Sequence, residues 1–229
     1  MAGKTEKLNL NEQLNDFIQK NRKVLIISLA GIIGAVIVLV TVFTVRDHLN
    51  SQALSQIEEF KRRYETISSL ADALSETPFW TQEASNLLED LDNFTNRNSG
   101  YTAARSYAIS ANIHQDQNNW IEAERAWVNA ARAGTRTYFA PVAFFNAAVA
   151  AEEQGNFSRA IELYNEALEY EGIFPAAPRT QFSIARLQEI QGDSSAALIS
   201  YMTLVSRWPQ DQVWVNLANS RILSLSIGQ

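Results

Sequence analysis

Residue types that perform catalysis or bind metals are scarce in this sequence. The chain contains no cysteine and two histidines, His48 and His114. Nucleophilic and general acid–base catalysis need such groups placed together in a pocket. Acid pairs such as Asp90/Asp92 and Glu152-Glu153 lack a His or Cys companion that would complete a metal site. We therefore expect a protein that is not an enzyme and that uses no cofactor and no metal.

The charges are unevenly distributed along the chain. Residues 1–45 contain five Lys or Arg and three acids, whereas residues 46–229 contain 14 Lys or Arg and 22 acids. The formal net charge of −6 is therefore the sum of +2 in the first part and −8 in the second. No lysine follows Lys61. Because nucleic-acid surfaces are basic, we expect no nucleic-acid partner.

An uncharged apolar segment of 22 residues runs from Val24 to Val45. As a helix it would be roughly 33 Å long, which is enough to cross a hydrocarbon core of about 30 Å. No small-residue cleavage site follows it, so we interpret it as an uncleaved signal anchor in the lipid bilayer. A basic cluster that ends at Lys23 precedes it. The positive-inside rule then predicts a cytoplasmic N-terminus and a large domain on the far side.

Residues 46–100 favour a long helix followed by a helical hairpin. Apolar residues recur every three or four positions and form one seam: Leu49, Ala53, Ile57, Phe60, Tyr64, Ile67, Ala71 and Leu74. One interpretation is a coiled coil, which would give a homo-oligomer through residues 49–74. The other is packing on the next helix of the same chain. Thr77 is placed to cap that helix and Pro78 to begin it.

The strongest pattern in the chain is a repeat of 37 residues. In each repeat an alanine is followed four positions later by a large aromatic residue and preceded five positions earlier by a turn residue. A second small residue lies twelve positions before the alanine. Close approach of two antiparallel helices requires small side chains, and a turn glycine ends the first helix of each pair. The aligned sets are Ala123, Ala160 and Ala197; Trp127, Tyr164 and Tyr201; Asn118, Gly155 and Gly192; and Ala111, Ala148 and Ala185.

The segment from Gly155 to Leu168 resembles the centre of a tetratricopeptide repeat, and the segment from Gly192 to Pro209 resembles it too. The first repeat departs from the pattern at Asn118, where glycine is usual, and at His114, where tyrosine is common. The expected fold is all-α, with an N-terminal transmembrane helix followed by a tetratricopeptide-repeat α-solenoid. We expect a cytoplasmic tail at 1–23, a transmembrane helix at 24–45, a long helix and hairpin at 46–100, three repeats at 101–209 and a capping helix at 210–229.

The architecture narrows the resemblance further. The segment from Phe17 to Lys23 before the membrane helix, the segment from Leu91 to Tyr107 and the terminal segment from Ile222 to Ile227 are similar to the YfgM-like family. That family is the ancillary subunit of the bacterial Sec translocon. The resemblance implies a bacterial inner-membrane protein with a periplasmic repeat domain. Its implied partners are translocon subunits, exported clients or chaperones.

The resemblance to tetratricopeptide stacks also implies a binding groove, which the first helix of each pair lines. Carried onto this sequence, the groove contains Arg105, Ala108, Asn112, Phe145, Val149, Glu152, Phe182, Arg186 and Glu189. Two aromatic residues among charges of both signs suit an extended or helical peptide. The alternative is that the two Phe rings are mostly covered by neighbouring helices.

Two functions therefore stay open at the sequence level. One is a membrane-anchored interaction scaffold or chaperone-like module that assists protein secretion. The other is a structural protein that self-associates through residues 49–74 and organises an envelope or cell-division complex.

Overall fold

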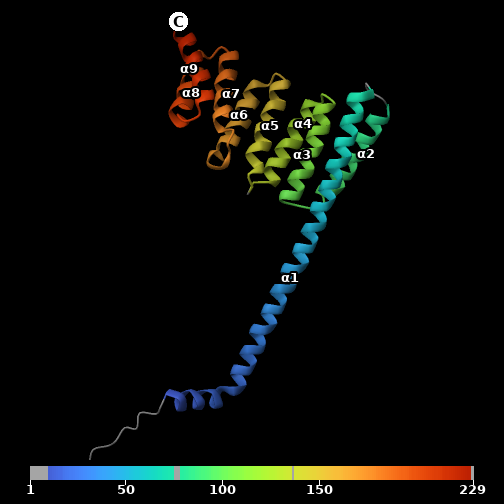
Figure 1. Cartoon of the computed structure of the whole chain (residues 1–229), viewed down its shortest axis with the longest axis vertical. Coiled ribbons are helices and arrows are strands. Elements are labelled where there is room, and N and C mark those ends of the chain that lie inside the picture. Colours follow the sequence, from blue (N-terminus) through green and yellow to red (C-terminus); the bar gives the residue numbers. More distant parts are fainter. Residues whose placement is uncertain (1–9, 75–77, 136, 228–229) are drawn as a thin grey trace, which may run out of the picture. The chain divides into compact units, whose positions relative to one another are not determined.

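The computed structural model describes residues 10–74, 78–135 and 137–227. The chain forms two compact units, of which the first ends at Gln52 and the second begins at Ala53. Helix α1 (Leu10–Leu74) runs through both (Figure 1). Within it, the segment Gln13–Val42 is long and apolar enough to cross a membrane, and its most apolar 18-residue window has a mean hydropathy of 2.9. A helix of this kind near the N-terminus is a feature of membrane anchors and of signal sequences alike.

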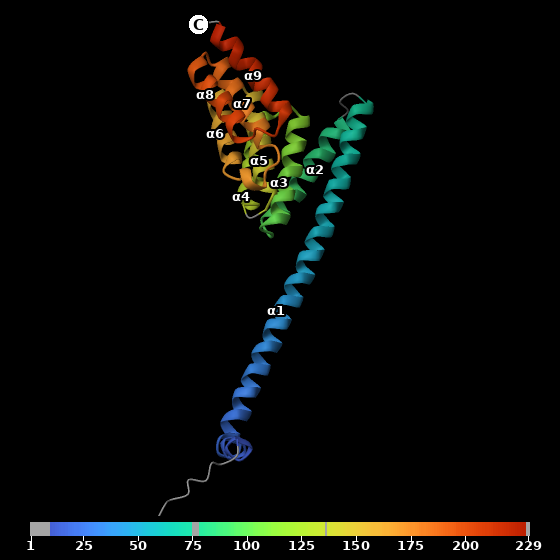
Figure 2. The same cartoon turned by 60° about the vertical axis from the view of Figure 1, so that its left-hand side comes forward.

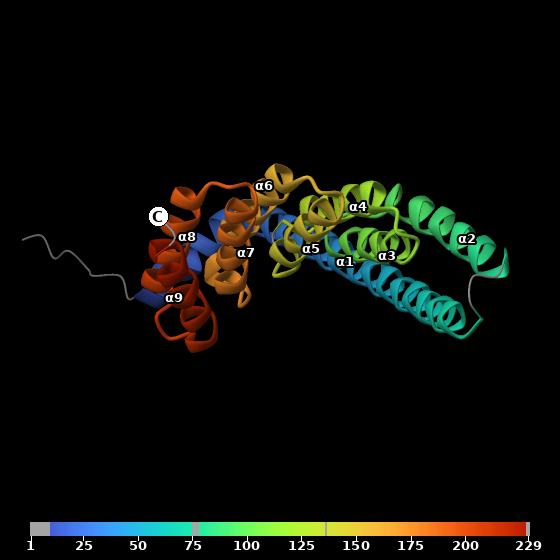
Figure 3. The same ribbon diagram turned by 90° about the horizontal axis from the view of Figure 1, so that it is seen from above.

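The second unit is a stack of helices in which each helix from α2 to α9 packs on the next one (Figure 2). Seen from above, the helices follow one another along the stack in sequence order (Figure 3). Across the described residues every regular element is a helix, so the predicted all-α solenoid is confirmed. The elements are α2 (Pro78–Thr95), α3 (Tyr101–Asp116), α4 (Trp120–Ala133), α5 (Phe139–Glu153), α6 (Phe157–Leu168), the 3-10 helix η1 (Glu171–Ile173), α7 (Ala177–Ile190), α8 (Ser194–Arg207) and α9 (Gln212–Ile227).

The repeated small residues lie where paired helices meet. Ala123, Ala160 and Ala197 are fully buried, and so are Ala111, Ala148 and Ala185 on the preceding helices. A larger side chain at these positions would push the two helix axes apart. The aligned aromatics Trp127, Tyr164 and Tyr201 are buried one turn further on. The 37-residue repeat is therefore the spacing of the helix-pair core.

The turns inside the helix pairs share one backbone conformation. Asn118, Gly155 and Gly192 have φ values of 56°, 71° and 81°, in the left-handed region that the sequence pattern predicts for them. Each of the two glycines is followed by the N-cap residue of the next helix, Asn156 or Asp193. The side chain of Asn156 accepts a hydrogen bond from the backbone N–H of Arg159 at 3.2 Å, and Asp193 repeats the interaction in the next pair.

The seam of α1 packs against its own chain. Ala53, Ile57, Phe60 and Ile67 are buried in one cluster with apolar residues of α2 and α3. The rings of Phe60 and Phe94 meet edge to face with centroids 5.7 Å apart. This arrangement corresponds to the interpretation in which the seam packs on the next helix of the same chain. The side chains of Leu49, Ala71 and Leu74, and all of Thr77, lie outside the described residues, while α2 begins at Pro78.

The last helix covers the stack with only one of its faces. Val215 and Ala218 are buried against α7 and α8, with Ile222 and Leu225 partly buried beside them. Val213, Leu217 and Leu223 of the predicted capping helix are exposed. The reason is that the apolar residues of α9 are spread around its circumference, and one neighbouring pair of helices can bury only one side.

Substitutions at two glycines test the role of the left-handed turns. Gly155→Ala adds no steric clash, because nothing lies within 4 Å of the new Cβ, but it places an L-residue at φ +71°. We expect the free energy of unfolding to fall by about 1 to 2 kcal/mol. Gly172→Ala is the control, since it is equally open and lacks a left-handed φ. It should raise stability by about 0.4 to 1 kcal/mol.

Both variants are compared by urea unfolding of the full chain in detergent micelles, followed by circular dichroism. Equal changes in the free energy of unfolding at the two glycines would contradict the role of the left-handed backbone at Gly155.

Candidate protein-binding groove

The predicted groove residues lie on the first helices of the pairs, α3, α5 and α7. All of them are half-buried except Ala108, which is buried. The side chain of Arg105 is already paired within the chain. Its guanidinium donates to Glu58 at 3.0 Å and to the Tyr101 hydroxyl at 3.3 Å. Val149 lies between Phe145 and Glu152 on α5, and Asn112 is one turn beyond Ala108 on α3. The predicted face thus contains charges that are already paired.

The charged groove residues form two interactions of the same kind, which we call the Tyr–Glu–Arg triads. In the first triad, Glu152 of α5 accepts a hydrogen bond from the Tyr164 hydroxyl of α6 at 2.5 Å and pairs with Arg186 of α7. Each triad therefore ties together three consecutive helices, two from one pair and one from the next.

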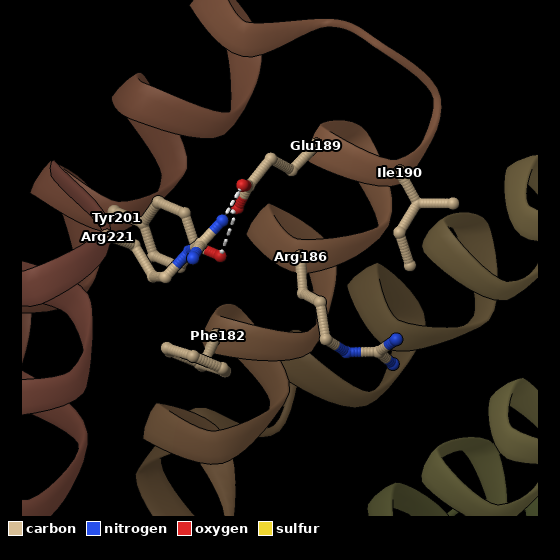
Figure 4. Close-up of a pocket in the computed structure, with 6 residues that line it drawn as sticks. All are labelled: Phe182, Arg186, Glu189, Ile190, Tyr201 and Arg221. Carbon is tan, nitrogen blue, oxygen red and sulfur yellow. Dashed lines mark hydrogen bonds and ion pairs between the residues drawn. The ribbon is translucent and has the colours of Figure 1, made fainter. Parts of the chain in front are cut away.

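The second triad repeats this pattern one unit further along the stack. Glu189 of α7 accepts from the Tyr201 hydroxyl of α8 at 3.1 Å and pairs with Arg221 of α9. Figure 4 shows these three side chains converging, while Arg186 points away from Glu189. That orientation agrees with its pairing to Glu152 in the preceding repeat.

Burial and the hydrogen bonds of the triads raise the pKa values of the two tyrosine hydroxyls. Burial, followed by the hydrogen bond to Glu189, raises the pKa of Tyr201 to about 12. Burial and Glu152 raise the pKa of Tyr164 still further. The two glutamate side chains are largely buried, at 16% and 18% exposure, so each charge depends on its arginine and tyrosine partners.

The first repeat lacks a triad. The positions 37 residues before Glu152, Tyr164 and Arg186 are occupied by Gln115, Trp127 and Val149. The indole Nε1 of Trp127 is accordingly buried without a hydrogen-bond partner. The two ends of the groove therefore differ in chemistry, with the two triads toward α9 and, at the α3 end, Arg105 paired with Glu58 in place of a triad.

The two groove phenylalanines sit in equivalent surroundings. Phe145 lies 5.2 Å from the Tyr164 ring, and Phe182 lies 5.3 Å from the Tyr201 ring, both at an interplanar angle of 58°. The guanidinium of Arg179 lies 4.9 Å above the Phe145 ring. Both Phe rings are half-buried. They are partly covered by their neighbours and partly available to a ligand.

An open pocket of about 370 Å³ lies on this surface beside Phe182 (Figure 4). It is lined by Phe182, Arg186, Glu189, Ile190, Tyr201 and Arg221. Three of these were predicted as groove residues. Sequence reasoning missed Ile190, Tyr201 and Arg221 as pocket residues. The repeat pattern identified Tyr201 as a packing residue only. Arg221 belongs to a helix outside the repeat alignment. Ile190 is 52% exposed at the end of α7.

A second pocket of about 280 Å³ lies among α2, α3 and α4 and includes His114. Burial lowers the pKa of His114, so the imidazole is neutral at pH 7. Its Nδ1 atom is buried without a hydrogen-bond partner. No group of three or more metal-binding side chains occurs among the described residues.

Comparison with known proteins agrees with this architecture. Residues 110–178 and 145–212 each match the family model of the tetratricopeptide repeat. A TPR repeat-containing protein of Treponema pallidum (strain Nichols) is 27% identical over 227 residues, which are 94% of each chain.

Two solved structures are similar in fold. A Rap protein complexed with Competence and Sporulation Factor has a TM-score of 0.50 and 18% identity over 71% of this chain. The apo form of RapI has a TM-score of 0.49 and 15% identity over 68% of it. The chain spans 47% and 58% of the lengths of those two proteins.

The fold and the groove define an α-solenoid, a class that typically serves as a non-catalytic platform for protein interactions. Residues 110–212 of this solenoid match the model of the tetratricopeptide repeat.

Removal of one hydroxyl tests the second triad. Tyr201→Phe should lower the free energy of unfolding by about 1 to 3 kcal/mol at pH 8, because Glu189 loses a buried hydrogen bond. The difference from the unmodified protein should shrink as the pH rises. The unfolded tyrosine loses its proton near pH 10, whereas the folded one keeps it until a pKa of about 12.

In that window the folded protein holds more protons than the unfolded chain, so a rise in pH favours unfolding more strongly where Tyr201 is present. Urea unfolding of the full chain at pH 8 and pH 11 measures the effect. A difference that stays constant or grows with pH would contradict it.

Proposed function

We propose that this protein is a membrane-anchored scaffold or chaperone-like module of the bacterial envelope, and that it assists secretion near the Sec translocon. The observation that carries the proposal is the pocket beside Phe182, where the half-buried Phe182 ring and the exposed Ile190 side chain share the lining with Arg186 and Arg221. The repeats on either side hold this surface in a fixed shape. The absence of a recognised reaction centre plays no part in the proposal.

The chemistry of the groove suits peptide segments with apolar side chains. Phe145, Phe182 and Ile190 offer apolar area, which stabilises a bound side chain by roughly 25 cal/mol per Å² buried. In each triad one glutamate balances one arginine, so the groove exerts little long-range attraction on either sign of charge. Binding through apolar anchors tolerates many sequences, which is the property that a chaperone-like module needs.

The N-terminal helix supports membrane attachment. Side chains in the segment Gln13–Val42 such as Ile27 and Ile33 are exposed, and none of the most apolar part is buried by protein. A bilayer would cover this surface. Lys20, Arg22 and Lys23 stand at its N-terminal end, so the positive-inside rule favours a cytoplasmic N-terminus and a periplasmic repeat domain in the inner membrane.

The translocon is proposed as the place of action from the resemblance to the YfgM-like family. A module tethered there would meet exported chains while they are extended and expose apolar side chains. Its expected partners are translocon subunits, exported clients or other chaperones. The competing proposal of self-association through residues 49–74 is disfavoured, since Ile57, Phe60 and Ile67 are buried within the same chain.

Site-specific photo-crosslinking in the native membrane tests the groove. A photoreactive residue at Ile190, which lines the pocket, should capture translocon subunits or exported chains. The matched control is Ile121 on α4, which is 62% exposed and lies outside both pockets. Capture of the same proteins from both positions, or only of cytoplasmic proteins from Ile190, would refute the proposal.

Protease treatment tests the proposed topology of the full chain. After the outer membrane has been opened, a protease added from outside should digest the repeat domain, and an antibody against the extreme N-terminus should still detect a protected fragment. The prediction fails if the repeat domain becomes sensitive only after the inner membrane has been lysed.

A further inference from the structure

The outer face of α9 is uncharged and has no partner in the described structure. Val213, Leu217, Leu223 and Ile227 are 66%, 45%, 63% and 77% exposed. The positions between them on this face are occupied by Asn216, Ser220 and Ser224. Arg221 is the single charged residue of α9, and it is bound to Glu189 in the groove. A terminal helix of a solenoid usually presents a polar outer face, so this one is exceptional.

The contacts of α9 show which position in the stack it occupies. Arg221 pairs with Glu189 as Arg186 pairs with Glu152. Trp214 contacts the ring of Phe182, as Arg179 contacts the ring of Phe145. Both correspondences align α9 with α7 at an offset of 35 residues. Helix α9 is therefore the first helix of another pair, and no second helix follows it in the described structure.

The same alignment identifies the face that the missing helix would cover. On α7, Ala185 is fully buried in a cluster with Ala197 of α8, and Gln181 donates to the Ser200 carbonyl of α8 at 3.4 Å. Their counterparts on α9 are Ser220 and Asn216. The exposed face of α9 is thus the face that receives α8 on α7, with a small residue at the point of closest approach.

We propose that this face binds the α9 helix of a second copy of the chain, so that two repeat stacks join end to end. A twofold axis perpendicular to the two α9 helices would make them antiparallel, as α7 and α8 are. Ser220 stands near the middle of Gln212–Ile227, so the axis would pass beside the one position where the helices can approach closely.

The lack of charge on this face also favours a second copy over a charged partner. A twofold axis brings identical groups together, and a charged face would repel itself. The α9 face contributes only apolar side chains, amides and hydroxyls, and Arg221 is neutralised by Glu189. Self-pairing therefore brings no like charges into contact. The inference is independent of the proposed groove function, because the groove lies on another face of α9.

Cysteine crosslinking tests the inference cleanly, since the natural chain contains no cysteine. Ser220→Cys in the full chain should form a disulfide-linked dimer under mild oxidation in detergent micelles, because the two sulfurs would meet at the twofold axis. Ser158→Cys, on the exposed surface of α6, is the matched control. Its dimer yield should be at least roughly tenfold lower.

A second variant separates pairing from accidental collision. Leu223→Lys added to Ser220→Cys should reduce the dimer yield by more than roughly tenfold, because it places two ammonium groups in the interface. Circular dichroism should show unchanged helicity, as Leu223 is exposed in one copy. The proposal would be overturned by equal dimer yields from Ser220→Cys and Ser158→Cys, or by a dimer yield that Leu223→Lys does not change. It would also be overturned if the Ser220→Cys variant crosslinked only to a different protein in native membranes.

Discussion

The structure depends on close contact between small residues at the centre of each helix pair. Ala148 and Ala160 are fully buried, and so are Ala185 and Ala197, because antiparallel helices can share a core only where side chains are short. No single pair could bury enough apolar surface to be stable alone. Each pair therefore needs the next one, and the concave surface follows from their repetition.

The Tyr–Glu–Arg triads relate this scaffold to the groove. A buried glutamate is costly unless it is paired, and each triad satisfies Glu152 or Glu189 from a neighbouring helix and from the following repeat. The same residues form much of the pocket wall. The groove is consequently shaped by side chains that also fix the spacing of the repeats, and Phe145 and Phe182 remain as its adaptable apolar part.

Much of the site could be located from the sequence, because the repeat fixes which residues share a face. The resemblance to tetratricopeptide stacks implied that Phe182, Arg186 and Glu189 face a groove, and all three line the pocket. Their interactions were not predictable. The sequence placed Arg186 on the groove face, and the structure pairs it with Glu152, 34 residues earlier in the chain. Arg221 lies in a helix aligned at 35 residues rather than 37, so the repeat pattern did not include it.

The sequence by itself determined the all-α class, the apolar N-terminal helix, the 37-residue unit and the left-handed turns at Asn118, Gly155 and Gly192. These are local properties, set by hydropathy, periodicity and backbone sterics. Only the tertiary structure decided that the α1 seam packs on its own chain, which charges pair, and which side of α9 stays open. Those outcomes depend on which surfaces compete for the same partner, and a one-dimensional pattern does not contain that competition.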